Sequence, residues 1–347
     1  MNRLRLIISL LGAWANLASA QSPWRTETSG TTAQLRGLSV VSAKVAWASG
    51  TKGTVLRTVD GDHWLALPVP GAGALDFRDI HAVDAHVAYV MAAGPGAASC
   101  IYKSTDGGGH WALQIANPDP DGFWDAIAFW DADHGIVMGD PVKGLFQARL
   151  TADGGATWIP VADAAGLAAL PNEGGFAASG TCLSVFGDRE VWFATGGAKM
   201  SRVLHSSDRG QTWRVAATPV PAGGPPKGLF SVAFITARRG FAVGGDYEKP
   251  QLDALNGACT EDGGLTWSAA PVLPTGFLSV VATIPGHSQI YVAAGGAGSG
   301  FSADAGRTWT VLDQIPVHTV GFSDRQTGWS VGAKGLVRKY VGKALSD

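Results

Sequence analysis

Charged residues are scarce in this sequence. Asp, Glu, Lys and Arg make up 16% of its 347 residues, and the formal net charge is -2. No stretch concentrates Lys and Arg, so the chain lacks the basic surface that a nucleic-acid-binding protein needs. No run of about 18 apolar residues follows the N-terminal stretch, so we expect no membrane-spanning helix. These absences predict a partner other than nucleic acid and a chain without a membrane span.

Cysteine is rare as well, and the common catalytic and metal-binding motifs are missing. Cys100, Cys182 and Cys259 lie far apart in the chain, with no C-x-x-C spacing. Two of them could pair in an oxidising compartment, but three separate buried thiols are the favoured interpretation. The eight histidines show neither H-x-H nor H-E-x-x-H spacing, and no Gly-x-Ser-x-Gly motif occurs. We therefore expect no metal and no cofactor.

The first 20 residues are typical of a secretory signal peptide. A basic start, Met1-Asn-Arg-Leu-Arg, precedes an apolar stretch over 6–17 and the small-residue sequence Ala18-Ser19-Ala20. We expect cleavage before Gln21 and a location in the periplasm or outside the cell. Residues 21–347 are then expected to form a single domain.

What the sequence does have is glycine, tryptophan and a repeated octet. The stretch "SSDRGQTW", residues 206–213, recurs with small changes, and its tryptophans follow one another at intervals of 42 to 55 residues. Each octet suits a hairpin turn, because the Asp carboxylate can accept backbone N–H groups and the Gly can take a positive φ. We expect a structural role for the octet aspartates, which are Asp60, Asp106, Asp153, Asp208, Asp262 and Asp304.

The segments between the octets predict the fold. Each octet follows three short apolar stretches that read as strands and precedes one more, which gives a four-stranded antiparallel blade. The last unit, from Val317 to Tyr340, has no octet and lacks an outer strand, and the segment 22–28 is available to supply it. The sequence therefore predicts an all-β fold, a seven-bladed β-propeller whose ring is closed by the N-terminal strand.

These repeats resemble those of the Asp-box (BNR-repeat) propellers, a group that includes sialidases, two-propeller xyloglucanases and sortilin-type receptors. The stretches "ASGTKGTVLRTVDGDHW" and "GWSVGAKGLVRKY" are most similar to the photosystem II stability and assembly factor-like branch of bacterial secreted proteins. The resemblance covers nearly all of the chain after Gln21. It implies a propeller with a binding or assembly role, although such repeats specify fold more strongly than activity.

Polar residues cluster on the predicted face opposite the octets, where the inner strands start and the second turns lie. An insertion over 165–178 is expected on the same face. The arginines suit a carboxylate or sulfate, and the carboxyl groups suit sugar hydroxyls or acid–base work. An alternative is that these charges only pair with one another across blades. The predicted ligand-binding residues are Arg36, Arg78, Trp124, Arg202, Asp246, Tyr247 and His318, and the candidate catalytic residues are Asp125, Asp140, Glu173, Asp246 and Tyr247.

Two functions fit this face. The first is a monomeric binding or assembly protein that holds an exported polypeptide or an acidic glycan. The second is a glycoside hydrolase or lyase that acts on an acidic sugar. This enzyme would need two of the carboxyl groups around one cavity beside Arg36 and Arg78, and one of these groups would need a raised pKa. A sialidase-like nucleophile at Tyr247 is disfavoured, because Phe77-Arg78-Asp79 departs from the Phe-Arg-Ile-Pro signature of that family.

Overall fold

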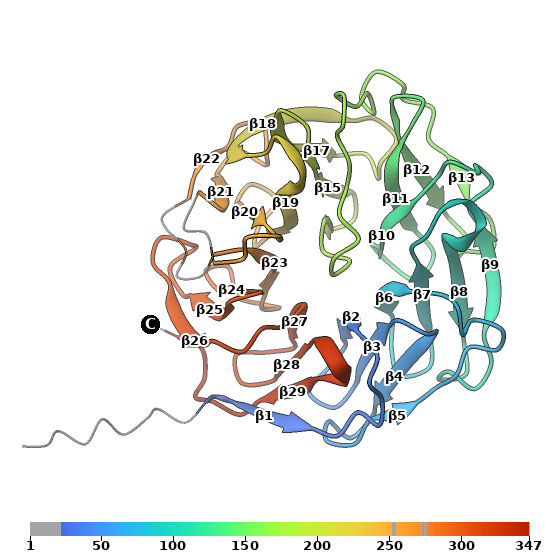
Figure 1. Cartoon of the computed structure of the whole chain (residues 1–347), viewed down its shortest axis with the longest axis vertical. Coiled ribbons are helices and arrows are strands. Elements are labelled where there is room, and N and C mark those ends of the chain that lie inside the picture. Colours follow the sequence, from blue (N-terminus) through green and yellow to red (C-terminus); the bar gives the residue numbers. More distant parts are fainter. Residues whose placement is uncertain (1–21, 252–254, 271–272, 274–275, 347) are drawn as a thin grey trace, which may run out of the picture.

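Seven antiparallel sheets stand around a central axis, as Figure 1 shows. The computed structural model describes residues 22–346 except 252–254, 271–272 and 274–275, so the predicted signal peptide over 1–20 lies outside the described residues. Six sheets have four strands and the fifth blade carries one extra short strand. The predicted seven-bladed β-propeller is therefore confirmed.

The strands follow the same order in every blade, from the central axis outward. The inner strands are β2 (Leu35–Val40), β6 (Phe77–Ala82), β10 (Trp124–Phe129), β14 (Leu183–Phe186), β19 (Gly224–Phe234), β23 (Leu278–Thr283) and β27 (Thr319–Phe322). The second strands are β3 (Ala46–Gly50), β7 (Ala88–Ala92), β11 (Gly135–Val142), β15 (Glu190–Ala194), β20 (Gly240–Asp246), β24 (Tyr291–Gly295) and β28 (Gly328–Val331).

The third and fourth strands complete the blades. The third strands are β4 (Thr54–Thr58), β8 (Cys100–Ser104), β12 (Leu145–Thr151), β17 (Met200–Ser206), β21 (Gly257–Thr260), β25 (Gly298–Ser302) and β29 (Val337–Tyr340). The outer strands are β5 (Leu65–Ala66), β9 (Ala112–Ala116), β13 (Ile159–Pro160), β18 (Arg214–Pro221), β22 (Ser268–Ala269), β26 (Thr310–Asp313) and β1 (Trp24–Glu27). The extra strand β16 (Gly196–Gly197) pairs with β19, and η1 (Gly96–Ala98) and η2 (Ala333–Gly335) are 3-10 turns.

The N-terminal strand closes the ring, as the sequence predicted. β1 pairs antiparallel with β29, with Trp24 opposite Tyr340 and Glu27 opposite Val337. The Trp24 side chain is buried and meets Tyr340 and Phe322 edge to face, at centroid distances of 5.2 and 5.9 Å. The seventh blade is thus built from both ends of the described chain.

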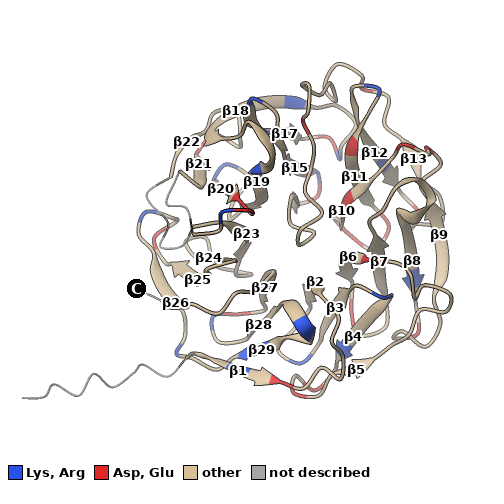
Figure 2. Ribbon diagram, viewed as in Figure 1, with Lys and Arg blue, Asp and Glu red and all other residues tan. Residues whose placement is uncertain are grey.

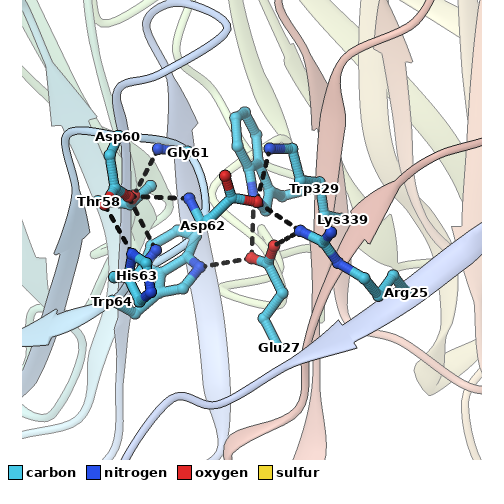
Figure 3. Close-up of polar contacts among 10 residues, drawn as sticks. All are labelled: Arg25, Glu27, Thr58, Asp60, Gly61, Asp62, His63, Trp64, Trp329 and Lys339. Atoms are coloured by element: carbon cyan, nitrogen blue, oxygen red, sulfur yellow. Dashed lines mark hydrogen bonds and ion pairs between the residues drawn. The ribbon is translucent and has the colours of Figure 1, made fainter.

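A polar network ties this closing strand to the first blade (Figure 3). Glu27 accepts the indole N–H of Trp64, from the first octet, at 2.8 Å and that of Trp329, from β28, at 3.3 Å. Beside it, Lys339 of β29 contacts Asp62 of the first octet at 3.2 Å. Side chains from β1, blade one and blade seven therefore meet where the ring closes.

The hydrophobic core lies between neighbouring blades. The second strands β3, β7, β24 and β28 are buried along their whole length, because each is covered on both faces by an adjacent blade. The largest apolar side chains in these layers include Trp47, Trp192 and Trp329, each fully buried. Such layers explain why the apolar stretches of the sequence are nearly continuous rather than alternating.

The octets form the hairpin turns expected of them. In the octet of blade four, Asp208 Oδ1 accepts the N–H groups of Gln211 and Thr212 at 3.0 and 2.9 Å, and Ser206 Oγ accepts the N–H of Gly210 at 2.8 Å. Gly210 has φ +80°, and its carbonyl accepts the Trp213 indole N–H at 2.9 Å. The equivalent bonds to Asp60, Asp106, Asp153, Asp262 and Asp304 are also present.

The three cysteines are unpaired in the described structure, as the favoured interpretation had it, but Cys259 is only partly buried. Cys100 and Cys182 are buried, and burial raises the pKa of the Cys100 thiol to about 11. Within the described part of the chain, no helix has the length and apolar character needed to cross a membrane.

Candidate functional site

A cavity of about 500 Å³ lies at the centre of the ring. Six blades contribute to it through residues near the start of their inner strands, such as Arg36, Phe123 and His318, and blade four contributes through the loop that precedes β14. Asp140, near the end of β11, and Tyr247, just after β20, also line it. Its size is in the range of about 300–1,000 Å³ in which protein pockets hold small ligands.

One side of the cavity is cationic. Arg36 of blade one and Arg78 of blade two both line it, as the sequence predicted for a ligand-gripping pair. Burial, and then the nearby charge of Arg78, lower the pKa of Arg36. Arg36 Nε is buried with no hydrogen-bond partner among the described residues, whereas Arg78 Nε donates to Asp76 Oδ2 at 2.5 Å. Two guanidinium groups on one side of the cavity suit a ligand with an anionic group.

His318, on the same side, also lines the cavity. Its Nδ1 donates to the Leu35 carbonyl at 2.8 Å. Burial, and then the charge of Arg36, lower the pKa of this imidazole, so it is neutral at pH 7. With its proton on Nδ1, the ring offers Nε2 as a hydrogen-bond acceptor.

Two carboxyl groups of blade three lie in the cavity wall. Asp125 is 1% exposed, and its Oδ2 has no hydrogen-bond partner in the described structure. Burial and the neighbouring charge of Asp140 raise the pKa of Asp125 well above its usual range, while the N–H of Ala177 and the charge of Arg78 oppose this rise. Burial also raises the pKa of Asp140, and the hydrogen bond from the Gly175 N–H, at 2.9 Å, opposes it. Two such groups share one negative charge more readily than they carry two.

The opposite side of the cavity is an aromatic wall, which we define as Phe176, Phe230, Tyr247 and Phe277. Phe176 stacks on Phe230 with ring centroids 3.7 Å apart and an interplanar angle of 17°. Tyr247 and Phe277 meet Phe230 edge to face, at 6.0 and 4.8 Å. Tyr247 is 47% exposed, so this wall reaches the outer surface. A ligand that meets it needs an apolar or aromatic part.

The insertion over 165–178 reaches the centre of the ring, where the yellow-green loop before β14 dips among the inner strands in Figure 1. Gly175, Phe176, Ala177 and Ala178 line the cavity. Arg78 Nη1 donates to the Ala177 carbonyl at 2.9 Å. The loop predicted to lie on the binding face therefore supplies part of the site.

Other predicted residues lie elsewhere. Glu173 and Arg202 form an ion pair outside the cavity, with Arg202 Nε at 2.8 Å from Glu173 Oε1, and the Glu173 side chain is fully buried. Trp124 is completely buried between blades two and three. Asp246 accepts the N–H of Glu248 at 3.0 Å and lies 3.9 Å from Lys227 Nζ. None of Glu173, Arg202, Trp124 or Asp246 belongs to the described cavity lining, so Arg202 does not join Arg36 and Arg78 there.

Three of the four residues of the aromatic wall were not predicted from the sequence. Phe230 occupies the repeat position of Arg36 and Arg78, although β19 begins earlier, at Gly224, and Phe277 directly precedes β23. Phe176 belongs to an insertion without a repeat partner, and nothing in the sequence indicated that it would stack on Phe230. Reading apolar as well as polar residues at these positions would have identified half of the wall.

Charged residues are sparse along the ribbon in Figure 2, which makes the cluster of arginines and carboxyl groups that line the cavity distinctive. In the described residues, no group of three or more His, Cys, Asp or Glu side chains is arranged to hold a metal ion. The site chemistry accordingly rests on two guanidinium groups, a carboxyl pair, one imidazole and the aromatic wall.

No family model and no curated protein matches this chain. Among solved structures, it is similar to "YCF48 bound to D1 peptide", with a TM-score of 0.65 and 20% identity over 93% of this chain and 98% of that one. It is also similar to YCF48 from Cyanidioschyzon merolae, with a TM-score of 0.65 and 19% identity over 92% and 98% of the two chains. At these identities the similarity establishes the propeller fold, in agreement with the resemblance seen in the sequence.

Proposed function

We propose that this protein is an exported binding or assembly protein that holds a segment of a polypeptide in its central cavity. The observation that carries the proposal is the meeting of Arg36 and Arg78 with the aromatic wall across one cavity of about 500 Å³. A polypeptide offers both groups that this arrangement suits, a carboxylate and an apolar side chain. The D1 peptide bound to one of the similar structures is a ligand of the same kind.

Arginine substitution tests this proposal. Labelled acidic peptides with and without an aromatic residue are titrated into the wild-type protein and into Arg36→Ala and Arg78→Ala. Loss of a charge-assisted hydrogen bond costs about 1.5–3 kcal/mol, which corresponds to a Kd about 10- to 150-fold weaker. The control is Arg214→Ala, which removes an exposed arginine on outer strand β18 and should leave the Kd unchanged. Equal binding by all four proteins would sink the proposal.

A carbohydrate-active enzyme is the second candidate, and one observation favours it. Asp125 and Asp140 line the same cavity as Arg36 and Arg78, and both carboxyl groups have raised pKa values. In glycosidases one carboxyl group is protonated and acts as the acid while its partner stays ionised, and a pair that shares one negative charge meets this requirement. Against this role, the Gly175 amide already occupies Asp140 Oδ1. Acidic oligosaccharides incubated with wild type, Asp125→Asn and Asp140→Asn provide the test: product formed only by wild type supports the enzyme, and no product from wild type rejects it for these substrates.

A further inference from the structure

Residues Gly174–Ala178, which we call the inner segment, cross the cavity much as a bound peptide would. Its backbone makes polar contacts at three places. The Gly175 N–H donates to Asp140 Oδ1 at 2.9 Å, and the Ala177 carbonyl accepts from Arg78 at 2.9 Å. Gly174 forms an isolated antiparallel bridge with Gly196, with N–O distances of 3.1 and 3.0 Å. These are the backbone donors and acceptors that any extended chain offers.

A single aromatic side chain accompanies these backbone contacts. Phe176 stacks on Phe230, which is 2% exposed, at a centroid distance of 3.7 Å. The inner segment otherwise carries only glycine and alanine. The contacts therefore combine one aromatic anchor with backbone recognition by Arg78 and Asp140, two residues that line the open part of the cavity.

The two ends of the inner segment are fixed independently of the cavity. On one side, Glu173 is held by Arg202 and accepts the Thr195 hydroxyl at 2.6 Å. On the other, Ser179 Oγ donates to the Ser279 carbonyl at 2.8 Å. These anchors do not involve Gly174–Ala178, so they would remain if the inner segment moved.

We propose that the inner segment occupies a peptide subsite in cis, and that the partner polypeptide displaces it, placing an aromatic residue of its own on Phe230. This inference rests on the proposed function and narrows its ligand to an extended chain with an aromatic residue. The partner's backbone then takes over the contacts to Asp140 and Arg78. Displacement also enlarges the space available beside Arg36, so the partner's carboxylate and aromatic groups bind together.

The geometry further specifies the residue that precedes the aromatic one. A Cβ atom added to Gly175 would lie 2.4 Å from Asp125 Oδ2 and 2.6 Å from Phe193 Cζ. Real Cβ atoms do not approach this closely, so a partner bound in the same pose needs glycine there. The preferred ligand is an extended peptide with the order glycine, then an aromatic residue.

The test asks whether the subsite binds in trans once it is emptied. The probe is a fluorescein-labelled nonapeptide with the sequence of residues 172–180, Asn-Glu-Gly-Gly-Phe-Ala-Ala-Ser-Gly, followed by fluorescence anisotropy. Phe176→Ala removes the stacking ring, and Gly175→Ala forces the inner segment away from Asp125. Both variants should bind the nonapeptide at least tenfold more tightly than wild type. The matched control is Gly73→Ala, where an added Cβ meets no atom within 4 Å, and it should behave as wild type.

Two further probes establish specificity. A nonapeptide with alanine in place of phenylalanine, and one with alanine in place of the glycine before it, should each bind the Phe176→Ala variant at least tenfold more weakly than the parent peptide. Equal affinity of wild type and both emptied variants for the parent peptide, with all melting temperatures within a few degrees, overturns the proposal.

Hydrogen exchange on the wild-type protein gives a readout that depends on no variant. Saturating nonapeptide should accelerate exchange of the Gly175 amide, because its acceptor on Asp140 is taken by the ligand, and slower exchange at Gly175 contradicts displacement.

The outcomes of these experiments also separate this inference from the proposed function. Acidic aromatic peptides that bind wild type without releasing Gly175 leave the function standing and reject displacement. Nonapeptide binding by the emptied variants, with no other acidic aromatic peptide bound by any protein, supports the subsite in cis and counts against the proposed function.

Discussion

Asp79 shows how a single buried carboxyl group couples two blades to pH. Its Oδ1 accepts the N–H of Ile80, and its Oδ2 accepts the N–H of Ile127 in the next blade, both at 2.8 Å. Burial nevertheless raises its pKa to about 7, above the value of about 3.9 for an unfolded aspartate. Because the folded-state pKa is raised, its contribution to stability is complete below about pH 4 and is lost as the pH rises through about 7.

We predict that Asp79→Asn lowers the free energy of unfolding by about 1–3 kcal/mol, because one amide oxygen cannot accept from both N–H groups. The variant should also lose less stability than wild type between pH 5 and pH 8. Urea denaturation at both pH values measures the two effects. Asp133→Asn, at an exposed position, is the control and should match wild type. If the free energy of unfolding of Asp79→Asn changes between pH 5 and pH 8 as much as that of wild type, the assignment of this pH dependence to Asp79 is contradicted.

The octet aspartates act by a different route, through hydrogen bonds rather than burial. Asp208 accepts two backbone N–H groups, and its Oδ2 accepts the Thr212 hydroxyl at 2.6 Å. We predict that Asp208→Ala lowers the free energy of unfolding by about 1 kcal/mol, as loss of a helix N-cap does. Thermal melting measures it, with Asp188→Ala, whose side chain is 78% exposed, as the control. Equal melting temperatures would show that the turn does not depend on its carboxylate.

At the scale of the strands, β1 carries more stability than its four residues suggest. Trp24 is 6% exposed and packs against Phe322 and Tyr340, and the guanidinium of Arg338 lies 5.5 Å from its ring centroid. We predict that Trp24→Ala lowers the free energy of unfolding by about 3–5 kcal/mol, as for other buried large-to-small changes. Val341→Ala, in the neighbouring segment and 52% exposed, should change it by less than about 0.5 kcal/mol. Denaturant titration of both variants measures these two changes in the free energy of unfolding.

The strands and their order were predictable because each repeat specifies them locally. Periodic apolar stretches and octet turns identify hairpins, and the missing outer strand of the last unit identified 22–28 as its replacement, now seen as β1 beside β29. The extra strand β16 was not predicted. It is two glycines long and pairs with β19 and Gly174, through contacts that depend on the insertion and on no repeated pattern.

The site was predictable only where it follows the repeat. Arg36, Arg78, Asp125 and His318 occupy equivalent positions near the starts of inner strands, so their convergence in one cavity follows from the propeller geometry. The pairing of Glu173 with Arg202 did not follow, because both belong to irregular segments whose folding depends on tertiary contacts. The same limit applies to Phe176.

At the scale of the whole molecule, the cavity charge should depend on pH. Besides the carboxyl pair Asp125 and Asp140, the charged groups near it are Arg36, Arg78 and Asp76, and His318 has a lowered pKa and stays neutral until the solution is more acidic. Because burial raises the pKa of Asp140 to about 6, the carboxyl pair takes up a proton as the pH falls below neutral. The cavity then becomes more positive.

We therefore predict that an acidic aromatic peptide binds more tightly at pH 5.5 than at pH 8, by about tenfold if one nearby negative charge is removed, an electrostatic effect of roughly 1.4 kcal/mol. Anisotropy titrations at the two pH values measure the ratio. The double variant Asp125→Asn/Asp140→Asn should bind equally at both, because both groups of the pair that can titrate have been replaced. Weaker binding at pH 5.5 by the wild-type protein would contradict the charge balance inferred for the cavity.

The pairing of β1 with β29 also bears on how the chain folds. Every other sheet consists mainly of strands that are neighbours in the sequence, whereas Trp24 pairs with Tyr340 across almost the entire described chain. Local hairpins form quickly, and contacts between distant residues form late. During synthesis, β1 is made first and has no partner until β29 has been made. Until then its exposed edge and the unsealed blades are open to wrong pairing with other chains, which makes ring closure the step at which this protein is most exposed to aggregation.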